Sequence, residues 1–241
     1  MPAWASNDAM KTIGLIGGMS WQSSAEYYRA INQGVQDRCG PLRSAAIVME
    51  SVDFEPIARA QREGRWDDAA VTLAAAARRL EGAGAACVVL CTNTMHKVAD
   101  TIHAAITIPF IHIADPVGDA ARAAGFQTLG LLGTAFTMTD RFISQRLEGR
   151  HGLAVLVPGA DDIAAVHRII YDELCVGVIR AESLRVYQGV IGRLRARGAQ
   201  AIVLGCTEIG LLVKAGDVDV PLLDTTILHA AAAVDFALAE A

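Results

Sequence analysis

The stretch GAACVVLCTN, residues 84–93, decides the fold because a second copy of it occurs later in the chain. That copy, GAQAIVLGCT, spans residues 198–207 and aligns with the first without a gap. Each copy contains a short, uninterrupted aliphatic run, which is typical of a strand covered on both faces in a parallel sheet. The alignment places Thr92 on Cys206, so the same strand exit carries a hydroxyl in one copy and a thiol in the other.

The repeat continues on both sides of this stretch. KTIGLIGGMS (11–20) aligns with QTLGLLGTAF (127–136), and Pro109 aligns with Pro221. Short apolar runs predict strands within residues 12–18, 45–50, 86–94, 108–114, 128–134, 153–159, 201–208 and 220–224. Segments with helical spacing and a closing glycine, such as 67–84 and 181–199, lie between them. The sequence therefore predicts an α/β fold with two pseudo-symmetric lobes, each a mostly parallel sheet flanked by helices, and a cleft between them.

The two copies also set the expected domain organisation. Residues 1–10 are predicted to be an N-terminal extension, 11–114 a first α/β lobe, and 115–225 a second α/β lobe. Residues 226–241 are predicted to form a C-terminal helix that packs back on the first lobe.

Composition narrows the class of protein. The 241 residues carry a net charge of −5, and the basic residues form no stripe that would neutralise a phosphate backbone, so nucleic acid is not an expected partner. No apolar run reaches the roughly 18 residues of a membrane span and the start of the chain lacks a leader pattern, so we expect a cytoplasmic protein without membrane contact. The five cysteines show neither CxxC nor zinc spacing, which predicts reduced thiols and no metal site.

Cys206 follows its aliphatic run, whereas Cys87 lies inside one, and this position favours a reacting thiol over a core thiol. Ligands of open α/β sheets bind beyond the carboxyl ends of the strands. Backbone N–H groups and a helix N-terminus there are expected to bind a carboxylate and to lower the pKa of the thiol from about 8.5. Two facing strand exits suit proton exchange at the α-carbon of a small carboxylate, with one residue removing a proton and its counterpart delivering one.

Four motifs together resemble the cofactor-independent aspartate/glutamate racemase family: GLIGGMSW (14–21), EYYRAIN (26–32), CTNTMHK (91–97) and LGCTEI (204–209). The resemblance implies an amino-acid racemase that uses one cysteine per lobe as its acid/base pair, needs no pyridoxal phosphate or metal, and forms a homodimer. Cys206 matches the second cysteine. The first slot falls on Thr92, and Cys91 is the alternative partner. A hydroxyl is a much weaker acid than a thiol, so we expect one direction of the reaction to be slower.

Other positions complete the candidate site. Glu208 stands where related glutamate racemases carry a histidine, so it either relays a proton or complements a helix end. The pocket floor is assigned to Met19 and Ser20. The turns that hold the substrate carboxylate are assigned to Asn93, Thr94 and Thr207.

Substrate choice and reaction class remain open at this stage. Aspartate-specific relatives bind the side-chain carboxylate with an arginine and a lysine, and the corresponding slots here fall near Ile57 and Cys175, which are not basic. Cys175 is expected to be buried on a helix. An acidic (Asp/Glu) and a broad specificity are thus both open. An arylmalonate-type decarboxylase with a single cysteine and a non-catalytic module that binds small carboxylates are the alternatives.

Overall fold

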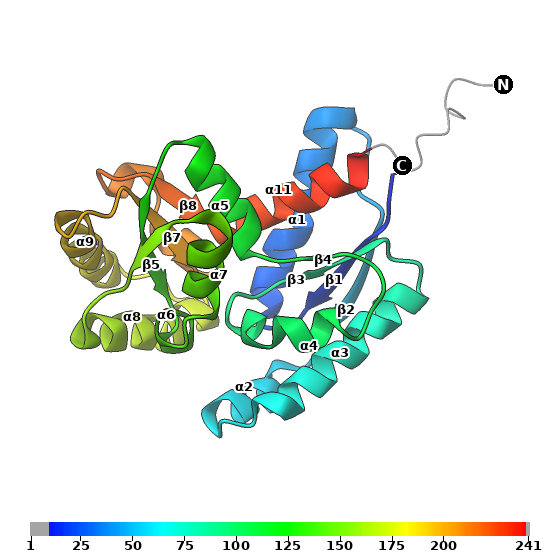
Figure 1. Ribbon diagram of the computed structural model, residues 1–241, viewed down its shortest axis with the longest axis horizontal. Coiled ribbons are helices and arrows are strands. Elements are labelled where there is room, and N and C mark those ends of the chain that lie inside the picture. The colour runs from blue at the N-terminus through cyan, green and yellow to red at the C-terminus, as the bar shows by residue number, and fades with distance from the viewer. Residues whose placement is uncertain (1–9, 240–241) are drawn as a thin grey trace.

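The computed structural model describes residues 10–239 and contains two parallel four-stranded sheets (Figure 1). The predicted extension, residues 1–10, lies outside the described residues except for Met10. The first sheet has the order β2-β1-β3-β4 and the second the order β6-β5-β7-β8, and all neighbouring strands are parallel. The predicted α/β class, the eight strands and the two-lobed architecture are confirmed.

The chain order of the first half is β1 (Ile13–Gly17), α1 (Trp21–Cys39), β2 (Ile47–Ser51), α2 (Phe54–Arg62), α3 (Trp66–Gly82), β3 (Cys87–Leu90), α4 (Ala99–His103) and β4 (Phe110–Ile111). The second half follows with α5 (Ala114–Ala123), β5 (Thr128–Gly133), α6 (Ala135–Thr139), α7 (Phe142–His151), β6 (Ala154–Leu156), α8 (Ala160–Asp172), α9 (Ala181–Ala196), β7 (Ala201–Gly205), α10 (Ile209–Leu212), β8 (Leu222–Asp224) and α11 (Thr225–Leu238).

The central strands account for the aliphatic runs of the sequence. All residues of β1, β3 and β7 are buried, because helices cover both faces of each sheet. The registers are equivalent in the two lobes: Ile13 pairs with Cys87 in the first, and Leu129 pairs with Ala201 in the second. The internal repeat is therefore a structural repeat, and it brings residues 92 and 206 to equivalent strand exits.

Helix α11 comes last in the chain yet packs on the first lobe, beside α1 (Figure 1). Its buried alanines, with Val234, cover β1 and α1, where they contact a core that includes Ile13, Leu15 and Tyr27. Small side chains allow the two helices to approach closely. The exact domain boundaries stay a prediction.

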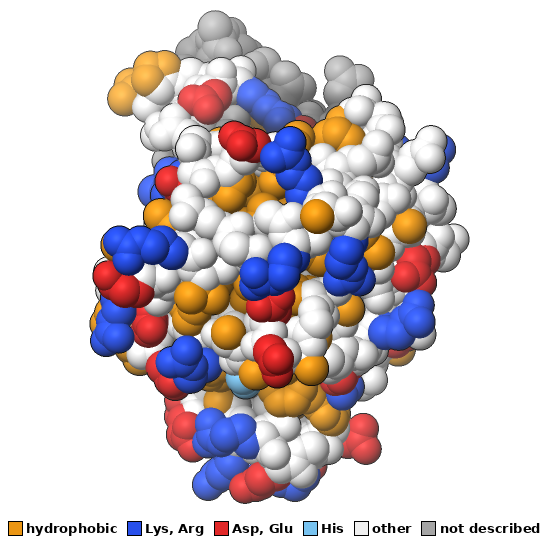
Figure 2. All heavy atoms as spheres, turned by 90° about the vertical axis from the view of Figure 1, so that its left-hand side faces the viewer, with side chains coloured by type: hydrophobic (Ala, Val, Ile, Leu, Met, Phe, Trp, Pro, Cys, Tyr) orange, Lys and Arg blue, Asp and Glu red, His pale blue; other side chains and the backbone are white. Residues whose placement is uncertain are grey.

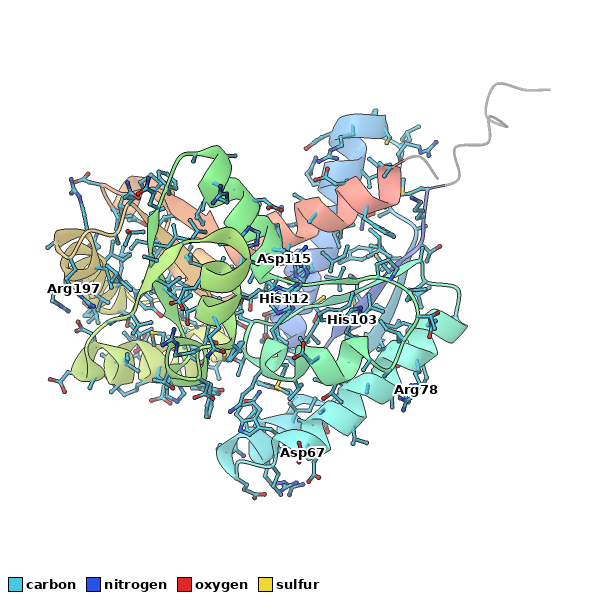
Figure 3. All side chains as sticks on the ribbon, in the orientation of Figure 1. Asp67, Arg78, His103, His112, Asp115 and Arg197 are labelled. Carbon is cyan, nitrogen blue, oxygen red and sulfur yellow. The ribbon has the colours of Figure 1, made fainter. Side chains whose placement is uncertain are left out.

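Three buried histidines occupy the junction between the lobes, where Figure 3 places His112 beside Asp115 at the start of α5. His96 Nε2 accepts a hydrogen bond from the Ile113 amide at 3.1 Å, so its Nδ1 carries the proton and donates to the Thr92 carbonyl at 2.8 Å. His229 donates from Nε2 to the Ile111 carbonyl at 2.7 Å. Burial lowers the pKa of all three imidazoles, to about 2 for His112 and about 4 for His229.

These neutral histidines predict a loss of stability in mild acid. Their pKa values lie below the unfolded value of about 6.5, so the unfolded chain binds more protons once the pH falls below that value. The stabilisation that comes from keeping these histidines neutral is complete above about pH 6.5. Between pH 7.5 and pH 5 we expect the free energy of unfolding to fall by roughly 1–2 kcal/mol per histidine. Urea titrations at the two pH values measure it. His229→Gln should reduce the difference, with the exposed His103→Gln as control; an unchanged difference in His229→Gln would contradict the assignment.

The side of the molecule shown in Figure 2 has no large patch of a single charge. There, Lys and Arg side chains alternate with Asp and Glu side chains over the second lobe. No helix within residues 10–239 is long and apolar enough to cross a bilayer. All five cysteines are free thiols, as predicted.

Candidate active site

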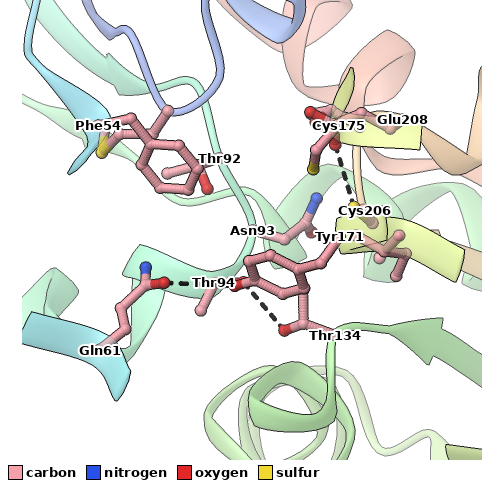
Figure 4. A pocket seen from close by; sticks show the side chains of 14 residues that line it. Phe54, Gln61, Thr92, Asn93, Thr94, Thr134, Tyr171, Cys175, Cys206 and Glu208 are labelled. Carbon is pink, nitrogen blue, oxygen red and sulfur yellow. Dashed lines mark hydrogen bonds between the residues drawn. The ribbon is translucent and has the colours of Figure 1, made fainter. Parts of the chain in front are cut away.

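A cleft lies between the lobes, beyond the carboxyl ends of the central strands of both sheets (Figure 4). The space within it that a water-sized sphere can occupy is about 30 Å³, so the walls of the cleft lie close together in this structure. The first lobe lines it with Met19, Phe54, Gln61, Thr92, Asn93 and Thr94, and the second lobe with Thr134, Ile170, Tyr171, Cys175, Gly205, Cys206, Thr207 and Glu208. Most predicted site residues are thus brought together.

Cys206 directly follows β7 and is 8% exposed. Glycines allow β5 and β7 to end close together beneath it, since a Cβ at Gly205 would lie only 2.7 Å from the Leu132 carbonyl oxygen. The Cys206 thiol donates a hydrogen bond to Glu208 Oε2 at 3.0 Å. Burial is the largest cause that raises the pKa of this thiol well above its ordinary value, and the Glu208 carboxylate raises it further.

The predicted lowering of the Cys206 pKa is therefore wrong for this state of the protein. The helix that follows, α10, has only four residues, and the Glu208 amide contributes just the smallest effect, a lowering. A short helix offers little dipole against the loss of water and a carboxylate at hydrogen-bond distance. Cys206 is a protonated thiol that points at a base.

Glu208 is 4% exposed and joins the two lobes. Its Oε1 accepts hydrogen bonds from Ser20 Oγ at 2.8 Å and Ser23 Oγ at 2.7 Å, both in the first lobe. Its Oε2 accepts from the Cys206 thiol and from Thr207 Oγ1 at 2.6 Å. Four donors and no ion pair surround this carboxylate in the described structure, so hydrogen bonds rather than a cation offset its burial.

Ser20 reaches Glu208 because it caps the 19-residue helix α1. Its hydroxyl accepts the Ser23 amide at 3.3 Å and donates to Glu208. The Glu208 carboxylate thus lies at the N-terminus of a long helix, where the helix dipole favours negative charge. Ser20 supports Glu208, whereas Met19 lines the cleft as predicted.

Thr92 occupies the exit of β3 and is 7% exposed. Its carbonyl accepts the His96 Nδ1 proton, which fixes the turn that presents its side chain to the cleft. Cys91, the alternative partner of Cys206, is not brought to the cleft. Its side chain is fully buried in the core against α1 and α11, and burial raises the pKa of its thiol. A Cys91–Cys206 pair would require this turn to change its course.

Asn93 and Thr94 continue the same turn. Asn93 donates from Nδ2 to Thr225 Oγ1 at 2.9 Å, and Thr225 in turn donates to the Leu204 carbonyl, so the orientation of the amide is determined. Asn93 Oδ1 is left as a buried acceptor without a protein partner. Thr94 Oγ1 lies 3.1 Å from Thr134 Oγ1, which groups two hydroxyls from opposite lobes at the cleft.

The sequence did not predict the residues on the side of the cleft away from Glu208. Gln61 on α2 and Tyr171 on α8 meet there, with the Tyr171 hydroxyl 3.4 Å from Gln61 Oε1 (Figure 4). Cys175, expected to be buried on a helix, is half-buried in a short 3-10 turn (Leu174–Val176) and lines the cleft, where burial raises its pKa to about 12. Ile57 is 2% exposed and belongs to the core of the first lobe.

Known proteins resemble this chain in sequence and in architecture. The Asp/Glu/Hydantoin racemase family matches residues 16–233. A glutamate racemase from Roseiflexus sp. (strain RS-1) is 32% identical over 180 residues, which are 70% of this chain and 60% of that relative; the chain thus spans less than two thirds of its length.

Two solved structures agree over nearly the full length. A Yersinia pestis protein classed with the Asp/Glu racemases is 51% identical, with a TM-score of 0.89 over 95% of this chain and 100% of the other. An aspartate racemase homologue from Pyrococcus horikoshii OT3 is 30% identical, with a TM-score of 0.82 over 95% and 99% of the two chains. The chain belongs to the Asp/Glu/Hydantoin racemase family.

Proposed function

We propose that the protein is a cofactor-independent racemase of α-amino acids, with acidic (Asp/Glu) or broad specificity. The observation that carries the proposal is the placement of Thr92 and Cys206 at equivalent strand exits of the two lobes, both facing one cleft. An α-carbon held between them meets a proton-transfer group on each side. Inversion requires this arrangement, because the proton must leave one face and arrive at the other.

Substrate binding uses the polar groups of the turns. Asn93 Oδ1, a buried acceptor without a protein partner, accepts a hydrogen bond from the α-ammonium group. The substrate carboxylate is held by the hydroxyls of Thr94 and Thr134 and by backbone amides of the turns after β3 and β7, the Thr207 turn included. This binding leaves the α-hydrogen directed at one of the two proton-transfer groups.

Proton transfer begins at Cys206. Glu208 accepts the thiol proton across the existing 3.0 Å hydrogen bond, and the resulting thiolate removes the α-proton. In the opposite direction the thiol delivers its proton to the carbanion, and the resulting thiolate recovers a proton that Glu208 takes up from water. Four hydrogen bonds hold the carboxylate in place for this relay, and no cation within residues 10–239 forms an ion pair with it.

Thr92 serves the other face, and its chemistry makes the two directions unequal. A threonine hydroxyl can donate a proton to a carbanion and recover one through water, but it rarely becomes an alkoxide base. The enantiomer whose α-hydrogen points at Cys206 is therefore expected to react faster than its mirror image.

Two substitutions of Thr92 test this asymmetry. Thr92→Val keeps the shape and removes the hydroxyl, so we expect turnover to the opposite enantiomer to fall at least tenfold. Exchange of the α-hydrogen at the Cys206 face is expected to persist in this variant. Thr92→Cys is expected to accelerate the slow enantiomer. Equal losses for both enantiomers in Thr92→Val would contradict the assignment of one face to each residue.

The activity itself is tested by proton NMR in D₂O with the purified protein and no added cofactor. A panel of L- and D-amino acids, aspartate and glutamate included, is followed for loss of the α-hydrogen signal, and chiral chromatography identifies the product. Exchange with inversion supports the racemase. No exchange with any of them would contradict it and would direct the assay to arylmalonate decarboxylation.

The proposal includes a cytoplasmic homodimer. An exposed apolar hollow along α1 and β2 supports it, since Trp21 is 68% and Tyr28 52% exposed beside Met49. Light scattering on the purified chain tests the dimer.

A further inference from the structure

The cleft contains one charged side chain, and that side chain is an acid. Of the described residues that line it, Glu208 is ionisable as a carboxylate, and none is a lysine, arginine or histidine. Among the nearby cations, Lys97 pairs with Asp140 at 2.7 Å, whereas Arg62 is exposed, pairs with Glu55 at 3.4 Å, and acts through its charge on the Tyr171 hydroxyl from outside the lining. A side-chain carboxylate of the substrate would thus enter a water-poor cleft whose lining already holds a carboxylate and, among the described residues, no counter-ion.

The side of the cleft away from Glu208 is instead built from neutral polar groups. Gln61 is 4% exposed, and its Nε2 donates to the sulfur of Met95, a thioether, at 2.9 Å. Thioethers are weak acceptors, and the Tyr171 contact to Gln61 Oε1 at 3.4 Å is long. Both polar atoms of this buried amide are therefore held loosely, and either can exchange its partner for a stronger one on a ligand.

Gln61 and Tyr171 come from different lobes and meet at the side of the cleft away from Glu208 (Figure 4). A substrate whose α-carbon lies between Thr92 and Cys206 directs its side chain toward this pair. An amide donates to Gln61 Oε1 and accepts from Gln61 Nε2 or the Tyr171 hydroxyl, and a hydroxyl can do the same.

We infer that the Gln61–Tyr171 pair makes the cleft selective for amino acids whose side chain is uncharged and ends in an amide or hydroxyl group. The inference rests on the proposed racemase function and narrows its substrate class. Gln61 and Tyr171 are then specificity-determining residues, because they contact the substrate side chain and not the reacting α-carbon.

The test compares isosteric substrates on the same enzyme. Asparagine and aspartate, like glutamine and glutamate, have nearly the same shape and differ in charge. Rates of α-hydrogen exchange in D₂O should give kcat/KM values at least tenfold higher for the amide member of each pair. The ratio does not depend on the fraction of folded enzyme.

If the Gln61–Tyr171 pair contacts the substrate side chain, a substitution of Gln61 changes the ratio of amide to carboxylate rates. Gln61→Arg places a cation beside Tyr171 and is expected to shift the amide-to-carboxylate ratio at least tenfold toward the carboxylates. Gln61→Met, the matched control of similar length, should lower the amide rates without raising the carboxylate rates. A Gln61→Arg ratio equal to that of the wild type would overturn the role of this pair.

The outcomes separate the inference from the proposed function. Wild-type rates that are equal for both members of a pair, or faster for the carboxylates, overturn the inference and leave the racemase intact. Absence of exchange with all four substrates and with the rest of the panel overturns the racemase, and the inference with it.

Discussion

Replacement of Cys206 by alanine is expected to lower α-hydrogen exchange by about 10³-fold or more for the enantiomer that faces the thiol. The side chain is small and lies at a strand exit, so its loss removes the acid/base group with little change in packing. Exchange of the α-hydrogen in D₂O measures the effect directly. The fold is checked by circular dichroism.

Cys175→Ala is the matched control, because Cys175 is a second thiol that lines the same cleft. It contacts no reacting atom in the proposed mechanism, and its exchange rate should stay within a few-fold of wild type. A variant Cys206→Ala that keeps full activity toward both enantiomers would exclude Cys206 as the proton-transfer group. Loss of activity in Cys175→Ala alone would assign the chemistry to the other thiol.

Replacement of Glu208 by glutamine is expected to slow the reaction and, at the same time, to lower the pKa of the Cys206 thiol. Turnover should fall by about 10²-fold, because the amide cannot accept the Cys206 proton. The pKa of Cys206 should nevertheless decrease, since the negative charge and the carboxylate hydrogen bond that raise it are gone. The free enzyme then forms thiolate at lower pH than wild type, although it is the slower catalyst.

The pH dependence of iodoacetamide alkylation measures the pKa of the Cys206 thiol, and α-hydrogen exchange measures turnover. Ser23→Ala is the control, because Ser23 also donates a hydrogen bond to Glu208, at Oε1, but has neither a relay nor a substrate-binding role. A Glu208 without a relay role would give the lowered thiol pKa with turnover close to that of wild type, and this result would rule out the relay. Thiolate formation that required a higher pH in Glu208→Gln than in wild type would contradict the electrostatic effect of Glu208 on the thiol.

The fold was accessible from the sequence because its signal is local and occurs twice. The aliphatic runs of β3 and β7 show where the buried strands lie, and the repeat alone aligns Thr92 with Cys206. The cleft position of both residues follows from the rule that ligands bind beyond the carboxyl ends of parallel strands. Thr134 was also within reach, since the repeat aligns it with Gly18 next to the predicted floor.

Other features depend on contacts between distant segments, for which the sequence carries no spacing signal. Gln61 and Tyr171 are 110 residues apart and meet because α2 and α8 face each other across the cleft. The pKa of Cys206 was predicted with the wrong sign for a related reason. The sequence places Glu208 two positions away, but the direction of its carboxylate and the depth of burial are set by Ser20 and Ser23 of the other lobe.

The position of α11 has a consequence for biosynthesis. On the ribosome, β1 and α1 emerge early, but Ala230, Ala233 and Val234, which cover them, follow some two hundred residues later. Until then the face of the first lobe formed by Ile13 and Leu15 lacks its cover, and such exposed apolar surface favours aggregation of a nascent chain. The first lobe therefore stays incomplete until the end of the chain has been translated, when the second lobe is also complete.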